Sequence, residues 1–142
     1  MAMRILLDTN VFVAVKNKAE PFYTESSNLL EIIDNGKMEC IVPSLVVAEL
    51  CTGYYQEDDE EGAEELLAAL LTTPTYKIIP MDHNIACKAG KIRARLGIKL
   101  PDAIVVATAI TNKATAIVTY DEEMKRAEKY IAVKTPKEII TR

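Results

Sequence analysis

Four acidic side chains lie where a carboxylate is costly or where a ligand is often bound. Asp8 interrupts the apolar run MRILLDTNVFVAV, and Asp121 directly follows the apolar segment TAIVTY. Glu49 falls on the apolar side of the predicted helix containing SLVVAEL, and Asp102 lies in the first turn of the apolar stretch LPDAIVVATAI. A carboxylate in apolar surroundings is unfavourable unless it is paired, hydrogen-bonded or bound to a cation.

Each of these acids also has a purely structural interpretation. Asp8 and Asp121 could cap the helices that follow them, Asp102 could interact with a helix dipole, and Glu49 could pair with Arg93. Taken together, however, four carboxylates in one region would repel one another, by about 4 kcal/mol for two charges about 4 Å apart at an effective dielectric constant of 20. Such a cluster raises its own pKa values or recruits a cation, and an all-oxygen donor set indicates Mg²⁺ or Mn²⁺. A cation held in this way can activate water and stabilise a phosphate during an in-line displacement.

The elements that position these acids alternate between strands and helices. Apolar segments predict strands at 3–7, 38–42, 75–80, 115–120 and 131–135. Between and after them, helices are predicted from residue 10 and at 22–35, 43–55, 57–71, 82–97, 100–113, 121–130 and 136–140. This order predicts an α/β fold with three layers, in which helices cover both faces of a parallel sheet. Ligands bind beyond the carboxyl ends of such strands, where Asp8 and Asp121 are expected to meet.

Composition narrows the classes of protein to which the chain could belong. Its 142 residues, 49% of them apolar, are expected to form one domain over 1–142. The net charge of −4 is not that of a protein that holds DNA by bulk electrostatics. No apolar run reaches the ~18 residues needed to cross a bilayer, so we expect no membrane association. The three cysteines (Cys40, Cys51 and Cys87) are expected to be buried and inert, which favours the reducing cytoplasm.

One segment of the acidic chain is locally basic. Residues 88–99 contain five lysines and arginines and no acid. On a helix, Lys88, Lys91 and Arg95 share one face, and Arg93 lies across the apolar stripe from them. The segment could be a solvated face, or it could contact phosphates, with Arg93 leaning toward the acidic residues.

Four motifs in order resemble the PIN-domain nucleases. They are LLDTNVFV, VPSLVVAEL, LPDAIVVATA and IVTYD, and they span nearly the whole chain. Among these nucleases, the motifs look most like those of the compact VapC-type toxin ribonucleases of VapBC toxin–antitoxin pairs. The resemblance implies a central parallel sheet of about five strands and cleavage of RNA that depends on Mg²⁺ or Mn²⁺.

The resemblance also assigns roles to residues of this chain. The family's acids correspond to Asp8, Glu49, Asp102 and Asp121, and its polar helpers to Thr9, Asn10 and Thr119. We expect Asp8, Asp102 and Asp121 to bind the metal directly and Glu49 to complete the site or act through water. The helpers, Asn10 and Thr119 above all, would orient the carboxylates or a metal-bound water, and Arg93, Lys91 and Arg95 would contact the RNA. The family implies a homodimer and a small antitoxin partner.

Three other functions remain open at this point. The chain could be a PIN-like nuclease that processes RNA without being a toxin, or a scaffold that binds a partner without catalysis. It could also be a phosphohydrolase with an aspartate nucleophile. The haloacid-type phosphatases, however, carry an aspartate two residues after the first, and this chain has Asn10 there.

Overall fold

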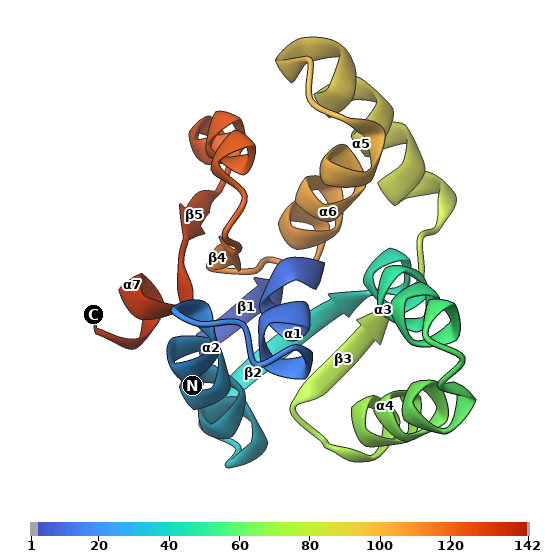
Figure 1. Ribbon diagram of the computed structural model, residues 1–142. Coiled ribbons are helices and arrows are strands. Elements are labelled where there is room, and N and C mark those ends of the chain that lie inside the picture. Colours follow the sequence, from blue (N-terminus) through green and yellow to red (C-terminus); the bar gives the residue numbers. More distant parts are fainter. Residues whose placement is uncertain (1–2, 142) are drawn as a thin grey trace.

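A parallel sheet of five strands forms the middle of the fold (Figure 1). The computed structural model describes residues 3–141. The strands are β1 (Met3–Leu7), β2 (Met38–Pro43), β3 (Tyr76–Ile79), β4 (Ala116–Val118) and β5 (Ala132–Lys134), in the spatial order β3-β2-β1-β4-β5. The chain builds β2 and β3 on one side of β1 and then crosses to β4 on the other. The order therefore reverses between β1 and β4, which is where such sheets bind ligands.

Helices cover both faces of the sheet, as the sequence predicts. One layer contains α1 (Thr9–Lys16), α2 (Phe22–Asp34), α3 (Ser44–Gln56), α4 (Glu60–Thr72) and α7 (Pro136–Ile140). The other contains α5 (His83–Leu96), α6 (Leu100–Thr111) and the 3₁₀ helix η1 (Glu122–Lys129). Along β1, Ile5 and Leu7 pack into the core beneath the first layer, and Leu6 packs into the core beneath the second. The strands read as continuous apolar runs because both of their faces are buried.

The element boundaries differ from the predicted ones in ways that local hydrogen bonds explain. The acidic helix predicted from residue 57 begins at Glu60, because the Asp59 carboxylate caps it by accepting the Gly62 N–H at 2.8 Å. The helix predicted over 121–130 is a 3₁₀ helix, η1, which the Asp121 carboxylate caps at the Glu123 N–H. Two of the five strands, β4 and β5, are only three residues long.

The expectation that all three cysteines are buried is wrong. Cys40 is buried in β2 and Cys51 is partly buried, but Cys87 is exposed. The buried stripe of α5 is formed by Ile85, Ala89 and Ile92, and position 87 falls on the outward side of that stripe. Of the helices between residues 3 and 141, none is both long and apolar enough to span a membrane.

Candidate active site

Asp8 is the most buried of the four acids, with 7% of its surface exposed. It follows the last residue of β1 and caps α1, where its Oδ1 accepts the Thr9 N–H at 2.9 Å. Its other oxygen, Oδ2, accepts a hydrogen bond from Thr119 Oγ1 at 2.9 Å. Asp8 can therefore cap α1 and contribute to a site at the same time. One oxygen accepts the capping hydrogen bond, and the other accepts a hydrogen bond from the residue that follows β4, where the strand order reverses.

Thr119 organises the polar groups around Asp8. Its hydroxyl donates to Asp8 and accepts two hydrogen bonds, from Asn10 Nδ2 and from the Asp121 N–H, each at 3.0 Å. Asn10 also accepts the Tyr120 N–H on its Oδ1 at 3.0 Å. A hydroxyl has one proton and two lone pairs, so all of the hydrogen-bonding capacity of Thr119 is used. Asn10 Nδ2 also lies 3.5 Å from Asp8 Oδ2, so both Asn10 and Thr119 contact Asp8, and their role in orienting the carboxylates stays a prediction.

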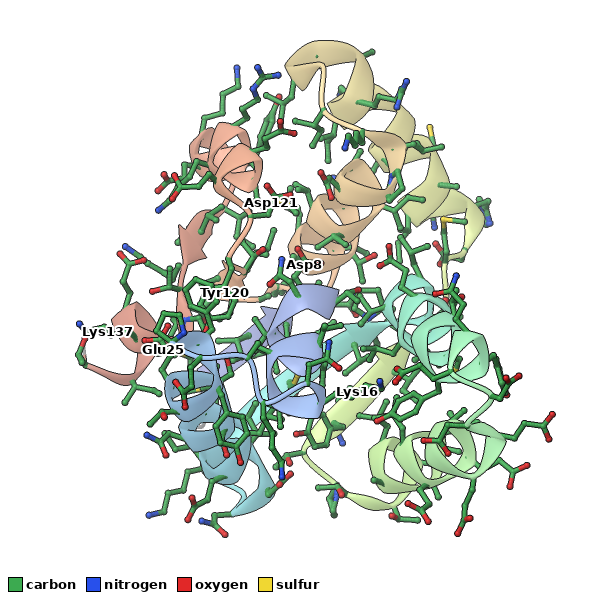
Figure 2. All side chains as sticks on the ribbon, in the orientation of Figure 1. Asp8, Lys16, Glu25, Tyr120, Asp121 and Lys137 are labelled. Carbon is green, nitrogen blue, oxygen red and sulfur yellow. The ribbon has the colours of Figure 1, made fainter. Side chains whose placement is uncertain are left out.

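The remaining acids line the same pocket. Asp121 follows β4 and caps η1, and Asp102 lies in the first turn of α6. Figure 2 shows Asp8 and Asp121 near each other above the first turn of α1, between η1 and α6. The pocket has a volume of about 310 Å³ and is lined by Asp8, Thr9, Asn10, Val13, Glu49, Pro101, Asp102, Val105 and Asp121.

Glu49 lies at this pocket, but its predicted burial is wrong. Its side chain is exposed, because the face of α3 that packs into the core is formed by Val46 and Leu50. Thr9 Oγ1 donates a hydrogen bond to Glu49 Oε1 at 2.6 Å, which ties the glutamate to the first turn of α1. The predicted alternative, an ion pair of Glu49 with Arg93, is not among the ion pairs of residues 3–141.

Burial and neighbouring negative charges raise the pKa values of two of the four acids, Asp8 and Asp102. Burial raises the pKa of Asp8; hydrogen bonds from Thr119 and Thr9 oppose this shift, and the charges of Glu49 and Asp121 add to it. Burial, followed by the charges of Asp121 and Asp8, raises the pKa of Asp102 to about 6, and Lys99 acts in the opposite direction. The pocket therefore concentrates negative charge that nearby cations only partly offset.

The donor chemistry of the pocket suits a hard divalent cation. Within residues 3–141, no three acidic, histidine or cysteine side chains form a group that could hold a metal ion as they stand. Mg²⁺, however, usually keeps several of its waters and takes only one or two carboxylates from a protein. Mutually repelling carboxylates around an open pocket fit a hydrated cation of this kind.

The basic residues predicted to contact RNA lie on different sides of α5. Lys91 and Arg95 line a hollow with Lys88 on another side of the α5–α6 pair, and Arg93 is exposed on the opposite flank of α5. Lys99, which the sequence analysis counted only as part of the basic segment 88–99, is the residue immediately before α6, and its charge lowers the pKa of Asp102. The position of this lysine three residues before a candidate acid is the sequence feature that could have indicated its effect.

Sequence reasoning also missed Tyr120 and Ser26. The Tyr120 hydroxyl is 2.6 Å from Ser26 Oγ and donates to the Phe22 carbonyl at 3.2 Å. Figure 2 shows Tyr120 beside the first turns of α2. Because its backbone N–H binds Asn10, Tyr120 connects α2 to the acidic pocket. Ser26 lies 94 residues away in the sequence, so no local pattern could have revealed the contact.

Comparisons with known proteins agree with the motifs. The family model for the PIN domain matches residues 5–130. The chain therefore belongs to the PIN domain family. A search of curated protein sequences found no match.

Solved structures with similar folds come from toxin–antitoxin systems. VapBC2 of Rickettsia felis, solved bound to a promoter DNA fragment, is 25% identical with a TM-score of 0.70, over 94% of this chain and 98% of that chain. A toxin–antitoxin complex of Klebsiella pneumoniae is 23% identical with a TM-score of 0.71, over 93% and 97%. VapC20 of Mycobacterium tuberculosis, described as a toxin that cleaves the sarcin–ricin loop, is 16% identical with a TM-score of 0.70, over 87% and 94%. The predicted VapC-like fold is confirmed.

Proposed function

We propose that the chain is an endoribonuclease that depends on Mg²⁺ or Mn²⁺ and acts as the toxin of a type II toxin–antitoxin pair. The observation that carries this proposal is the convergence of Asp8, Glu49, Asp102 and Asp121 on one pocket of a PIN-domain chain. They come from four separate segments and meet where the strand order reverses. Their mutual repulsion is a cost that a bound cation would remove.

Within this proposal each residue has a defined task. Asp8, Asp102 and Asp121 would hold the cation, with Glu49 completing the site or acting through water. The cation would supply an activated water and neutralise charge on the phosphate. The hydrogen bonds from Thr119 and Thr9 favour the ionised form of the buried Asp8 and fix the directions of its oxygens. Thr9 likewise restrains Glu49 at the lip of the pocket.

The toxin assignment rests on the solved structures of similar fold, which include a toxin–antitoxin complex and a toxin that cleaves the sarcin–ricin loop. By analogy with them, we propose that residues 1–142 form one PIN domain that acts in the cytoplasm. We also propose that the protein forms a homodimer and binds a small antitoxin protein. Lys91 and Arg95 stay candidates for RNA contacts, and an RNA contact of Arg93 remains a prediction based on the sequence.

Expression in cells tests the toxin function. A toxin should arrest growth when it is expressed alone, and the Asp8→Asn variant should not. Growth that is unaffected by an active nuclease would favour a role in RNA processing.

The direct test is cleavage of an end-labelled structured RNA in Mn²⁺, in Mg²⁺ and in EDTA. The wild-type protein, Asp8→Asn and Glu64→Gln should be purified in parallel; Glu64 is an exposed acid on α4 and serves as the matched control. We expect cleavage that requires the metal, survives in Glu64→Gln and falls at least about a hundredfold in Asp8→Asn, since a metal ligand stabilises the transition state by several kcal/mol. Equal cleavage by Asp8→Asn with an unchanged circular dichroism spectrum would refute the proposal.

One observation favours a second function, a scaffold without catalysis. The acidic side chains of the described residues form no ready-made group of three metal ligands. Calorimetric titration with Mn²⁺ separates the two functions. Binding that disappears in Asp8→Asn supports the nuclease, and the absence of binding by a folded wild-type protein supports the scaffold.

A further inference from the structure

A second concave surface lies on the flank of the α5–α6 pair. It is a hollow of about 200 Å³, lined by Lys88, Lys91, Ile92, Arg95, Ile110 and Tyr130, and we call it the basic hollow. Its cations come from one face of α5, and its apolar floor comes from α5, from α6 and from the residue that follows η1. The basic hollow and the acidic pocket share no lining residue.

The cations of the basic hollow form no ion pair within the described residues. Lys88, Lys91 and Arg95 are exposed. The ion pairs among residues 3–141 are Arg4–Glu39, Lys16–Glu57 and Lys125–Glu128, so they involve none of these three cations. Helix α5 contains no acidic residue. In a chain with a net charge of −4, this local excess of positive charge favours an anionic ligand.

The floor of the basic hollow provides a second kind of contact. The Tyr130 side chain is 39% exposed, and Lys129 Nζ lies 5.8 Å from the centre of its ring. Ile92 and Ile110 complete an apolar base. Single-stranded nucleic acid is recognised by this combination, in which cations track phosphates while bases stack on aromatic side chains. A nucleic acid supplies a planar base with every phosphate, whereas an acidic peptide supplies an aromatic group only where its sequence contains one.

The position of the basic hollow relative to the acidic pocket suggests which part of an RNA it could bind. Helix α6 contributes Asp102 and Val105 to the acidic pocket and Ile110 to the basic hollow. Residues 102 and 110 are about 12 Å apart along the helix axis, since each residue advances about 1.5 Å. An RNA strand at the acidic pocket could thus reach the basic hollow only with nucleotides beyond the bond that is cleaved.

From these observations we propose that the basic hollow binds a single-stranded segment of the substrate RNA away from the cleaved bond, with a base on Tyr130 and phosphates on Lys88, Lys91 and Arg95. This inference rests on the proposed ribonuclease function and extends it to a second contact. It predicts that the hollow contributes to affinity for long RNA and leaves the chemical step unchanged.

The first experiment measures binding by fluorescence anisotropy with a fluorescein-labelled single-stranded RNA in EDTA, where the proposed cleavage is absent. Lys91→Ala and Arg95→Ala should each weaken binding about threefold to tenfold and reduce the slope of log K against log salt by about 0.7. Tyr130→Leu keeps apolar volume but removes the stacking surface, and should weaken binding about tenfold. Lys37→Ala, at an exposed lysine beside the start of β2, is the matched loss of charge and should bind like the wild-type protein.

A cross-linking experiment locates the RNA directly. Cys87 is exposed next to Lys88, whereas Cys40 is buried and Cys51 is partly buried. A benzophenone maleimide attached at Cys87 should therefore cross-link to bound RNA, and the yield should fall in the Lys91→Ala background. Cys87→Ser treated in the same way controls for labelling at Cys51.

The outcomes separate this inference from the proposed function. If the wild-type protein cleaves RNA, the basic-hollow variants should raise KM for long RNA and leave kcat unchanged. RNA binding that depends on the basic hollow in a protein that cleaves nothing would support the inference and refute the nuclease. Variants that bind and cleave RNA like the wild type would overturn the inference. The same variants should also be tested for binding to a labelled polyglutamate peptide. If they lose binding to this peptide but not to RNA, the inference is overturned and the basic hollow binds an acidic protein partner.

Discussion

Replacement of Asp102 by asparagine should stabilise the metal-free protein while abolishing its activity. Burial and the charges of Asp121 and Asp8 raise the pKa of Asp102 to about 6, from an ordinary value of 3.8. The ionised carboxylate is therefore less favourable in the folded state than in the unfolded state at pH 7. Asparagine has nearly the same shape and carries no charge, so it removes that penalty.

The magnitude follows from the pKa difference. A shift of one pKa unit corresponds to about 1.4 kcal/mol, so a fully buried group with this shift would cost about 3 kcal/mol. Because Asp102 is only partly buried, water screens much of the interaction and we reduce the figure to about 1 kcal/mol. For a chain of this size, that raises Tm by about 3 °C.

The pH dependence has a definite sign. A carboxylate whose pKa is raised on folding binds protons more strongly in the folded state, so the folded state gains stability as pH falls. For Asp102 the gain develops as pH falls through about 6 toward 3.8. The Tm of the wild-type protein in EDTA should therefore rise relative to that of Asp102→Asn between pH 7 and pH 5, and the two values should converge.

The assay is differential scanning fluorimetry of both proteins in EDTA and in MnCl₂, with Glu64→Gln as the control. Mn²⁺ should raise the Tm of the wild type, because a ligand that binds only the folded state stabilises it, and should change the Tm of Asp102→Asn much less. A lower Tm for Asp102→Asn in EDTA at pH 7 would refute the reasoning. It would show that the Asp102 carboxylate makes net stabilising contacts and is not repelled by its neighbours.

Two further predictions concern the hydrogen bonds around the pocket. Thr119→Val keeps the side-chain shape but removes the donor to Asp8 and the acceptor for Asn10 and the Asp121 N–H. We expect the free energy of unfolding, measured in urea, to fall by about 2–4 kcal/mol. We also expect the affinity for Mn²⁺, measured by calorimetry, to fall. Unchanged Mn²⁺ affinity would show that Thr119 has only a structural role. Ser26→Ala removes the fully buried hydroxyl that binds Tyr120, and should lower the free energy of unfolding by about 1 kcal/mol in the same urea titration. No change in stability would contradict the link between α2 and the pocket.

The positions of the first and last acids could be predicted from the sequence because the backbone fixes them. Asp8 and Asp121 each follow an apolar strand directly or after two residues, and parallel strands of one sheet end at the same edge. Their capping hydrogen bonds also depend only on neighbours in the sequence. The sheet and its helical layers follow from the same alternation of apolar segments.

The burial of Glu49 could not be predicted in this way. A helical projection gives the direction of a side chain relative to its own helix, and it placed Glu49 beside the apolar residues of α3. What lies opposite that direction depends on other elements, and here it is the open pocket and Thr9. Cys87 shows the same limit, because the buried stripe of α5 is narrower than its apolar composition suggests.

The site combines one buried acid, which accepts hydrogen bonds on both oxygens, with three acids that are more exposed to water. Asp8 is buried and held on both oxygens by Thr9 and Thr119, whereas Asp102 and Asp121 are partly exposed and Glu49 is exposed. A fixed carboxylate can define where a cation sits, and partly exposed ones can adjust to its water shell. Two expected effects would then have one cause, the repulsion among these four side chains. Removal of the Asp102 charge should raise the stability of the protein, and binding of Mn²⁺ to the intact site should raise it as well.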